Sequence, residues 1–290
     1  MNLTLALRLG RISNLPTVWT NVMVGALLAG GGLGDARLPL LMVALSLFYV
    51  GGMFLNDAFD RDFDAQHRPE RPIPSGQVSA RQVFIIGFGL LAAGLVGVAL
   101  ASRGPDGLPA WRALASGVAL GAAIVYYNAH HKGNPLSPLV MGVCRVLVVL
   151  TAAFSVAAVL PTAVVLAAIA LLCHLIGLTY IAKQEHLDRI GGLWPLGFLA
   201  LPGVYGFALA MHTPVVWLWL VLYEGVLIFA LNLLRRRARG DVPRAVVTLI
   251  AGMSVLDGMV LAGAGQILPA ALALLAFVLT LVLQRWVSGT

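Results

Sequence analysis

The chain has 290 residues, of which 60% are hydrophobic and only 11% charged, and its formal net charge is +7. Soluble domains carry about a quarter of their residues as charged side chains, so too little polar surface is available here to coat a water-soluble globule. The composition therefore excludes a soluble enzyme, a disordered chain and a DNA-binding module. It predicts an all-α polytopic membrane protein.

Ten apolar segments are long enough to cross a bilayer, which requires about 20 residues. In chain order they cover roughly residues 14–32, 38–58, 82–102, 110–128, 138–158, 161–183, 193–211, 214–234, 244–264 and 267–286. Prolines or glycines stand near many of the junctions, where they end helices. We expect one transmembrane domain over residues 1–290, a bundle of nine to ten transmembrane helices in which one late segment is re-entrant if only nine span.

The basic residues separate by side of the membrane. Fifteen of the nineteen Lys and Arg residues lie at the termini or in the loops after even-numbered segments, whereas the odd-numbered loops hold only Arg37, Arg103 and Arg112. Because loops rich in Lys and Arg stay in the cytoplasm, both termini and the even-numbered loops are predicted to be cytoplasmic. A multi-pass protein of the cell (inner) membrane is expected, and its topology explains the positive charge without a nucleic-acid partner.

The acidic residues gather after two of the segments. Five of the twelve fall within residues 57–70, and a smaller group, Glu185 and Asp188, follows the sixth segment. The second and sixth segments lie four apart and end on the same side of the membrane. This spacing predicts two related four-helix units, each with one acidic loop. Since carboxylates oppose the helix dipole at a C-terminus, both loops are expected to have a partner of positive charge.

The first acidic loop has the spacing of a metal site. Asp57, Asp60 and Asp64 fall at i, i+3 and i+7 on one face of a helix that is expected to continue through them. Asn56 lies beside that face, and Asp62 points elsewhere. Three carboxylates stacked in this way repel each other unless divalent cations lie among them. Hard oxygen ligands on one side suit Mg²⁺ that keeps positions open for phosphate oxygens.

Three arginines follow in the same loop and are placed to contact phosphate oxygens, namely Arg61, Arg68 and Arg71. We therefore predict a phosphate-bearing substrate held through magnesium at the cytoplasmic mouth of a helical bundle. The alternative is a solvated acidic cap that only ends the second segment. The CDP-alcohol phosphotransferases also have an Asp-x-x-x-Asp, but their upstream Asp-Gly-x-x-Ala-Arg is absent before Asp57.

A family resemblance begins with residues 56–76. They read Asn-Asp-x-x-Asp-x-x-x-Asp followed by Arg-Pro-Ile-x-x-Gly, and they resemble the first signature of the UbiA superfamily of intramembrane prenyltransferases. The resemblance extends in order and spacing to Arg11, Asn14, Pro16, Tyr126, Tyr127 and Lys132. Two further stretches, residues 134–145 and 180–185, look more like the EboC-like branch than the quinone or heme branches.

The resemblance implies a UbiA-like helical bundle that transfers a prenyl group, an alkyl group other than methyl, from a polyprenyl diphosphate to a small acceptor, commonly an aromatic carbon. Mg²⁺ is the implied cofactor, and the hydrocarbon tail would lie between helices, open to the lipid bilayer. The residues implied in catalysis are Asp57, Asp60, Asp64, Glu185 and Asp188, with Asp57, Asp60, Asp64 and Asp188 as metal ligands. Those implied to bind the diphosphate are Asn14, Asn56, Arg61, Arg68, Arg71, Lys132, Arg145, Tyr180, Lys183 and Gln184.

The second family signature, normally Asp-x-x-x-Asp, is altered here. Gln184 stands four residues before Asp188, and Glu185 stands three before it. Glu185 shares a helix face with Asp188, whereas a neutral Gln would hold a second magnesium more weakly. The sequence therefore does not decide whether catalysis with two metal ions is retained. The competing hypotheses are a binding or scaffold protein that lost catalysis and a small-molecule carrier.

Polar residues inside the predicted spans are functional candidates, because charge in a bilayer is unfavourable by about 2.5–3.5 kcal/mol on insertion scales. Arg145 either approaches the diphosphate or extends to the interface. Asp257 is placed to contact an acceptor or to pair with Arg145 or a backbone group, and His174 is expected to be an interhelical hydrogen-bonder. The sequence does not specify the acceptor, the prenyl length, the protein partners or the oligomeric state.

Overall fold

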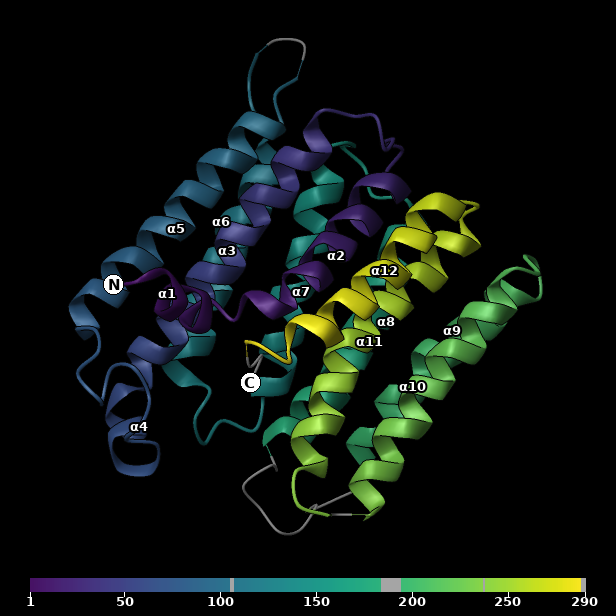
Figure 1. The fold of residues 1–290 in the computed structure, drawn as a ribbon. Helices are drawn as coiled ribbons and strands as arrows, with labels where there is room; N and C mark the ends of the chain where they lie inside the picture. Colours follow the sequence, from purple (N-terminus) through teal and green to yellow (C-terminus); the bar gives the residue numbers. More distant parts are fainter. Residues whose placement is uncertain (105–106, 184–193, 237, 288–290) are drawn as a thin grey trace.

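The computed structural model describes residues 1–104, 107–183, 194–236 and 238–287, and these ranges are helical, with one isolated bridge between Arg103 and Pro109. The helices in chain order are α1 (Leu3–Leu9), η1 (Ile12–Asn14), α2 (Leu15–Leu28), α3 (Arg37–Phe59), α4 (Arg61–His67), α5 (Ala80–Ala101), α6 (Trp111–His130), α7 (Ser137–Phe154), α8 (Thr162–Lys183), η2 (Trp194–Ala200), α9 (Leu201–Ala210), α10 (Val216–Arg236), α11 (Asp241–Gly263) and α12 (Ile267–Leu283). The all-α fold class is confirmed (Figure 1).

Each of the ten predicted segments corresponds to one helix, with η2 and α9 together forming the seventh. Within the described ranges, six helices are long and apolar enough to cross a membrane by themselves: α3, α5, α7, α8, α10 and α11. The sequence did not predict the short helix α1, and it predicted the start of α4 only as a continuation of the second segment. Both precede or follow a long helix at the end of the bundle where the acidic loop lies (Figure 1).

The long helices pack around α2, which contacts α3, α7, α8, α11 and α12. One apolar core lies among α2, α3, α5, α6 and α7, and a second lies among α7, α8, α10 and α11. α11 is central, because 89% of its most apolar window is buried inside the protein. Glycine allows the closest approach between α3 and α5: a Cβ on Gly51 would lie 2.8 Å from the carbonyl oxygen of Gly87.

The loops that carry the predicted site lie at one end of the bundle. Residues 60–79 follow α3 and residues 131–136 follow α6, and side chains from both loops line the same cavity as Lys183 at the C-terminal end of α8. Lys183, the last residue of α8, donates a hydrogen bond to the carbonyl of Asn134 at 2.7 Å. The expectation that the second and sixth segments end on the same side is thus confirmed.

The C-terminal helix closes the bundle beside the N-terminus. α12 packs against α2 and η1. Gln284, which directly follows α12, donates from Nε2 to Oδ1 of Asn14 at 2.7 Å. Residues near the two ends of the chain are therefore joined next to the predicted site.

Candidate active site

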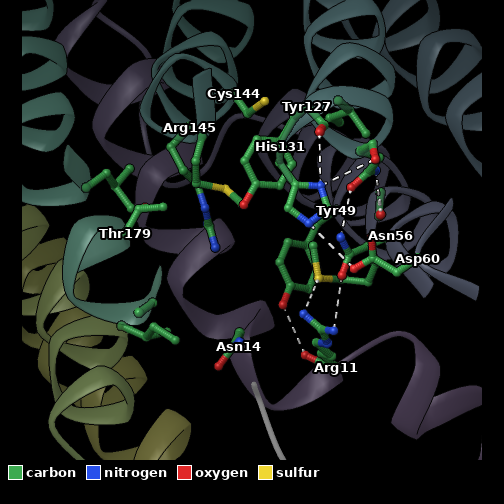
Figure 2. Close-up of a pocket in the computed structure, with 18 of the residues that line it drawn as sticks. Arg11, Asn14, Tyr49, Asn56, Asp60, Tyr127, His131, Cys144, Arg145 and Thr179 are labelled. Atoms are coloured by element: carbon green, nitrogen blue, oxygen red, sulfur yellow. Dashed lines mark hydrogen bonds and ion pairs between the residues drawn. The ribbon is translucent and has the colours of Figure 1, made fainter. Parts of the chain in front are cut away.

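A cavity of about 500 Å³ opens at the end of the bundle where the acidic loop lies. Its mouth is lined by charged side chains: Arg11, which precedes η1, Asp60 at the junction of α3 and α4 (Figure 2), residues of α4 and of the loops after α4 and α6, and Lys183. The rest of its lining is mostly apolar and includes Val18, Phe48, Leu120, Ile124, Val148, Leu175, Leu178 and Met253. The arrangement suits an amphipathic molecule with a charged head and a hydrocarbon body.

The acidic motif spans a junction between two helices, which corrects the prediction of one continuing helix. α3 ends at Phe59, Asp60 occupies the junction, and α4 begins at Arg61. The chain keeps the helical spacing across the break, because the Asp60 N–H donates to the Asn56 carbonyl and the Asp64 N–H donates to the Asp60 carbonyl. The three predicted carboxylates therefore still share one side.

Burial separates these carboxylates from their neighbour in sequence. Asp57, Asp60 and Asp64 are 7%, 8% and 3% exposed. The Asp62 side chain, in contrast, is 84% exposed. Buried carboxylates require hydrogen bonds or opposite charges, and each of the three has them.

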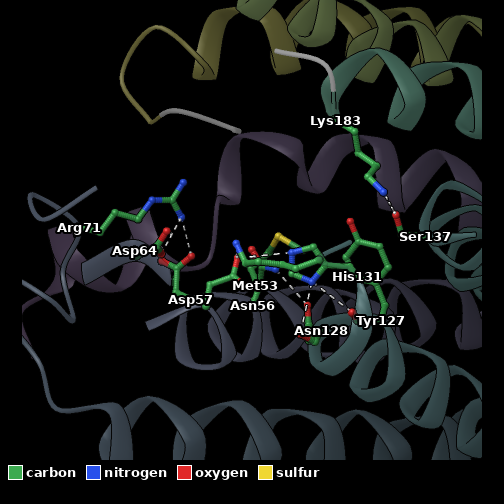
Figure 3. Close-up of polar contacts among 12 residues, drawn as sticks. Met53, Asn56, Asp57, Asp64, Arg71, Tyr127, Asn128, His131, Ser137 and Lys183 are labelled. Atoms are coloured by element: carbon green, nitrogen blue, oxygen red, sulfur yellow. Dashed lines mark hydrogen bonds and ion pairs between the residues drawn. The ribbon is translucent and has the colours of Figure 1, made fainter. Parts of the chain in front are cut away.

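Arg71 joins Asp57 and Asp64. Its Nη1 lies 2.9 Å from Oδ1 of Asp57 and 3.9 Å from Oδ2 of Asp64 (Figure 3). The cation reaches both carboxylates from the loop after α4, which folds back over the end of α3. The predicted proximity of Arg71 to the acidic motif is thus present in the structure.

Arg11 reaches the same motif from the segment before α2. Its Nη2 donates to Oδ1 of Asn56 at 3.2 Å and to Oδ1 of Asp57 at 3.3 Å. Its backbone has a φ of 43°, in the left-handed region that is unfavourable by about 1–2 kcal/mol for a residue with a Cβ. The Tyr49 hydroxyl donates to the Arg11 carbonyl at 3.2 Å, so α3 holds this turn in place.

Asp60 is paired with the loop after α6. Lys132 Nζ lies 3.1 Å and His131 Nε2 lies 3.5 Å from its Oδ2. Lys132 also sits 3.6 Å from the centre of the Phe63 ring, a cation–π contact. Burial by itself raises the pKa of Asp60, but His131 and Lys132 outweigh it, so the pKa lies below its ordinary value. Asp60 is therefore held in its ionised form.

Asp64 has the opposite electrostatic balance. Burial raises its pKa above the ordinary value, and the nearby charges of Asp60 and Asp57 raise it further, against the opposing effect of Arg71. Of these two carboxylates, Asp64 takes up a proton first as the pH falls. A cation bound close to it would favour the ionised form instead.

Asn56 is oriented by a residue that sequence reasoning missed. Its Nδ2 donates to Oδ1 of Asn128 at 3.2 Å, and Nδ2 of Asn128 donates to the Gly52 carbonyl at 3.0 Å. Asn128 lies near the end of α6 and lines the cavity. A signal was available, since Asn128 is a polar residue in an apolar segment one turn before Lys132.

The second acidic stretch contributes one described residue to the cavity. Lys183 donates from Nζ to the Asn134 carbonyl and to Oγ of Ser137, the latter at 2.8 Å (Figure 3). Tyr180 is half-buried on α8 and is not among the cavity-lining residues. Gln184, Glu185 and Asp188 lie outside the described residues, so their predicted roles stay predictions.

Arg145 lines the cavity farther inside the bundle, two turns into α7. Its Nη1 donates to Oδ1 of Asn21 at 3.2 Å, and its guanidinium lies 5.3 Å from the centre of the Tyr49 ring. Asn21 in turn donates from Nδ2 to Oδ2 of Asp257 at 2.7 Å. The pairing of Arg145 with Asp257, one of the expected alternatives, is therefore an indirect one through an amide.

The predicted site residues separate into groups. Those that line the cavity are Asn14, Asn56, Asp60, Asp64, Arg68, Arg71, Lys132, Arg145 and Lys183. Asp57 is adjacent to it, where it contacts Arg11 and Arg71. Arg61 lies away from it: its Nε is 3.6 Å from Asp62, and its guanidinium lies over the Phe84 ring at 5.7 Å.

Two histidines form contacts that link separate parts of the bundle. His131 was not among the predicted site residues, yet its Nε2 lies 3.5 Å from Oδ2 of Asp60 and it lines the cavity. His174 was expected to bond between helices, and it does, with the Tyr223 hydroxyl and the Leu249 carbonyl both at 2.9 Å.

The donor set fits a hard divalent cation. Asp57, Asp60 and Asp64 supply carboxylate oxygens and Asn56 supplies an amide oxygen. Within the described residues, no three acidic, histidine or cysteine side chains converge on one point. A cation here would thus have one or two carboxylate ligands and take its other ligands from water or a substrate, which is the usual coordination of Mg²⁺ in proteins.

Comparison with known proteins finds relatives for part of the chain. The digeranylgeranylglyceryl phosphate synthase of Methanopyrus kandleri is 37% identical over 136 residues, which is 47% of this chain and 46% of that protein. The synthase of the same name from Methanothrix thermoacetophila is 34% identical over 116 residues, 40% of each chain. The matched region thus spans less than half the length of these relatives.

The fold is shared with a solved structure. A UbiA homolog from Archaeoglobus fulgidus, bound to GPP and Mg²⁺, has a TM-score of 0.60 and 15% identity, and the match covers 91% of this chain and 99% of that chain. At this identity the likeness concerns the fold. The family model for the UbiA prenyltransferase family matches residues 18–235, well over half of the sequence. This multi-pass integral membrane protein belongs to the UbiA prenyltransferase family.

Proposed function

We propose that the protein transfers a prenyl group from a polyprenyl diphosphate to a small acceptor inside the membrane, in a reaction that depends on Mg²⁺. One observation carries the proposal: three buried carboxylates, each paired with a cationic side chain, stand at the mouth of a cavity whose interior is apolar. A diphosphate head belongs at such a mouth and a hydrocarbon chain in such an interior.

Mg²⁺ would be held at the Asp57, Asp60 and Asp64 motif, with one or two of these carboxylates on any one ion, and Asp188 of the altered second signature is proposed as a further ligand. When bound, the ion supplies positive charge that stabilises the departing diphosphate. The UbiA homolog from Archaeoglobus fulgidus was solved with GPP and Mg²⁺, which supports this choice of ion and donor class.

The cationic side chains are placed for the phosphate oxygens. Arg71 and Lys132 lie within 4 Å of carboxylates of the motif, so a diphosphate beside these carboxylates is within reach of both. Arg68 and Lys183 line the same mouth. Charge-assisted hydrogen bonds from these groups hold the head and stabilise the charge that develops as the C–O bond breaks.

The apolar interior protects the reactive fragment. Loss of diphosphate leaves an allylic cation, which survives only where water is excluded. Aliphatic and aromatic side chains line this part of the cavity. The cation would then be captured by the nucleophilic atom of the acceptor in the same space.

The acceptor class is the finer part of the proposal. The sequence resemblance favours an aromatic carbon. The curated relatives described above are named as synthases of digeranylgeranylglyceryl phosphate, and this name favours a glyceryl phosphate lipid. The EboC-like branch stays a prediction. We further propose that the mouth of the cavity faces the cytoplasm at the inner membrane, because the basic loops lie at that end.

Pyrophosphate release tests the proposal. Purified protein in lipid would be supplied with Mg²⁺ and geranyl, farnesyl or geranylgeranyl diphosphate, with and without aromatic and glyceryl phosphate acceptors. We expect acceptor-dependent release that EDTA and Asp57→Ala both abolish, while the exposed-site control Asp62→Ala retains it. Mg²⁺-dependent thermal stabilisation by the diphosphates without release would favour the binding or scaffold protein. If neither release nor stabilisation is observed, this donor class is rejected and the carrier is favoured.

A further inference from the structure

Arg145 is a buried cation that the first acidic motif does not use. We propose that it forms a second anion site, which binds a negatively charged group on the acceptor and so selects acidic acceptors, either a carboxylate or a phosphate. This inference rests on the proposed prenyl transfer, because it names the substrate class of the same cavity. Arg145 would be a specificity-determining residue and Asn21 its positioning residue.

The burial of Arg145 is the first observation. The residue is 9% exposed and lines the cavity on α7. In Figure 2 its guanidinium extends into the space that Tyr49 and Thr179 also face. A cation in the membrane interior is unfavourable and is kept mainly where it faces a cavity or a partner.

The partners of Arg145 leave most of its donors available. A guanidinium has five N–H donors. Among the residues that the structure describes, the Arg145 side chain donates to one acceptor, Oδ1 of Asn21, and has no carboxylate within 4 Å. Arg11 and Arg71 at the mouth, in contrast, both contact Asp57 directly. Arg145 therefore has guanidinium donors available to a ligand, and it lies apart from the carboxylates of the first motif.

A fixed relay positions the guanidinium. Asn21 accepts from Arg145 and donates to Asp257, and Thr20 also donates to Asp257, at 2.5 Å. These residues come from α2 and α11, which pack together beside α7. The carboxylate balances the charge from one residue away. The amide between them prevents the direct ion pair that would occupy the remaining donors of Arg145.

The site lies deeper than the first motif. Arg145 lies over the ring of Tyr49, and Tyr49 precedes Asp57 by eight residues of α3, or about 12 Å along the helix axis. An anion at Arg145 is thus at a different depth from a phosphate beside Asp57 and Arg71. The donor can place its diphosphate at the first motif while the acceptor places its anionic group at Arg145, and the reacting atoms of the two substrates then lie between the sites.

The chemistry of guanidinium indicates the ligand. Its planar fork matches a carboxylate or a phosphate, and an aromatic acid and a glyceryl phosphate lipid both supply one. A neutral acceptor would give the remaining guanidinium donors only neutral partners, and hydrogen bonds to charged groups are the stronger ones. The proposed preference is therefore for charge, whatever the rest of the acceptor.

Two matched pairs of acceptors test the preference and identify the source of the anion. The aromatic pair is 4-hydroxybenzoate and 4-hydroxybenzyl alcohol; the lipid pair is geranylgeranylglyceryl phosphate and geranylgeranylglycerol. Equilibrium binding to full-length protein in phosphatidylcholine nanodiscs is measured for all four, together with the KM of the donor and of each acceptor. The binding measurement needs no turnover, so it decides the role of Arg145 even if no prenyl transfer is found and the proposed function fails.

We expect the wild type to bind the charged member of one pair at least about tenfold more tightly, the value of one charged hydrogen bond. Arg145→Gln should reduce this ratio to within about twofold and leave the KM of the donor within about threefold. Arg145→Lys should give an intermediate ratio, because it keeps the charge without the fork. Thermal unfolding of each variant confirms that it is folded.

Asn21→Leu tests the relay without removing the cation. It should lower the charge preference by about threefold on its own and have no further effect on Arg145→Gln, the non-additivity of residues that act together. It also keeps the test decisive if Arg145→Gln does not fold. Equal binding of charged and neutral members in both pairs would overturn the proposal. So would an unchanged preference in Arg145→Gln with a raised KM of the donor, which would assign Arg145 to the diphosphate.

Discussion

The mouth and the interior of the cavity hold their cations in different ways. At the mouth, Arg11, Arg71 and Lys132 contact carboxylates directly, at 2.9–3.3 Å. In the interior, Arg145 contacts the amide of Asn21, and the carboxylate of Asp257 lies beyond that amide. Both regions use an arginine and an aspartate, but the order of the groups differs.

The difference follows from access to water. Near an aqueous mouth, water weakens an ion pair relative to a pair in a low-dielectric interior, so its members can exchange partners when a metal or a phosphate arrives. In a low-dielectric interior a direct pair is much stronger and would resist exchange. An intervening amide keeps the buried charge balanced while its donors stay available. Both arrangements therefore leave the cavity able to bind an anion.

The largest effect is expected from removing a buried carboxylate at the mouth of the cavity. Asp64→Asn should reduce kcat/KM for the donor by at least about 100-fold, because even outer partners of metal ligands account for 10–100-fold. Asp62→Asn is the matched control: the same acidic stretch and the same substitution, but on an exposed side chain. It should stay within about twofold. Pyrophosphate release under saturating acceptor measures both, and equal losses would show that overall charge, rather than the buried set, matters.

A smaller effect, on the KM of the donor, is expected to distinguish Arg71 at the mouth from Arg61, which lies away from the cavity. Arg71→Gln removes the cation shared by Asp57 and Asp64 and should raise the KM of the donor by about 10- to 100-fold, the range for hydrogen bonds to charged groups. Arg61→Gln removes a cation that contacts Asp62, Phe84 and the Ala58 carbonyl away from the cavity, and its effect should stay below about threefold. Titration of the donor at fixed Mg²⁺ compares the two. A loss at Arg61 equal to that at Arg71 would contradict the assignment.

The smallest effect is expected at Asn128, the uncharged residue that orients Asn56 at the mouth of the cavity. Asn128→Ala leaves Asn56 and the Gly52 carbonyl without their partner, and should lower the free energy of unfolding by about 1–3 kcal/mol. Gln77→Ala, at an exposed loop residue whose side-chain amide donates to the Ser75 hydroxyl, should change it by less than about 0.5 kcal/mol. The midpoint of thermal unfolding in detergent compares the variants. An unchanged midpoint in Asn128→Ala would show that Asn56 is held without it.

Much of the fold was predictable because lipid imposes a simple rule. A span must be apolar and about 20 residues long, and each of the ten predicted segments corresponds to a helix. The helix break at Asp60 was not predictable, because the carboxylate spacing is the same on one helix or two. The first motif was predictable from spacing that is local in sequence, and Asp60, Asp64, Arg68 and Arg71 do line one cavity.

The contacts that no spacing reveals are the long-range ones. Asn21 and Asp257 meet across 236 positions of the chain, and each alone is simply a polar residue in an apolar segment. His131 reaches Asp60 only because α6 ends beside α3. Such partners depend on how helices rotate and cross, and helix rotation is set by packing that a single sequence does not display.

The bond between Gln284 and Asn14 has a consequence for biogenesis. Asn14 lines the cavity at its mouth, and its amide partner is made some 270 positions later in the chain. A nascent chain inserted span by span would thus hold an unfinished pocket until α12 enters the bundle. The order of synthesis delays completion of the pocket, so incomplete chains released early from the ribosome would lack a finished substrate site.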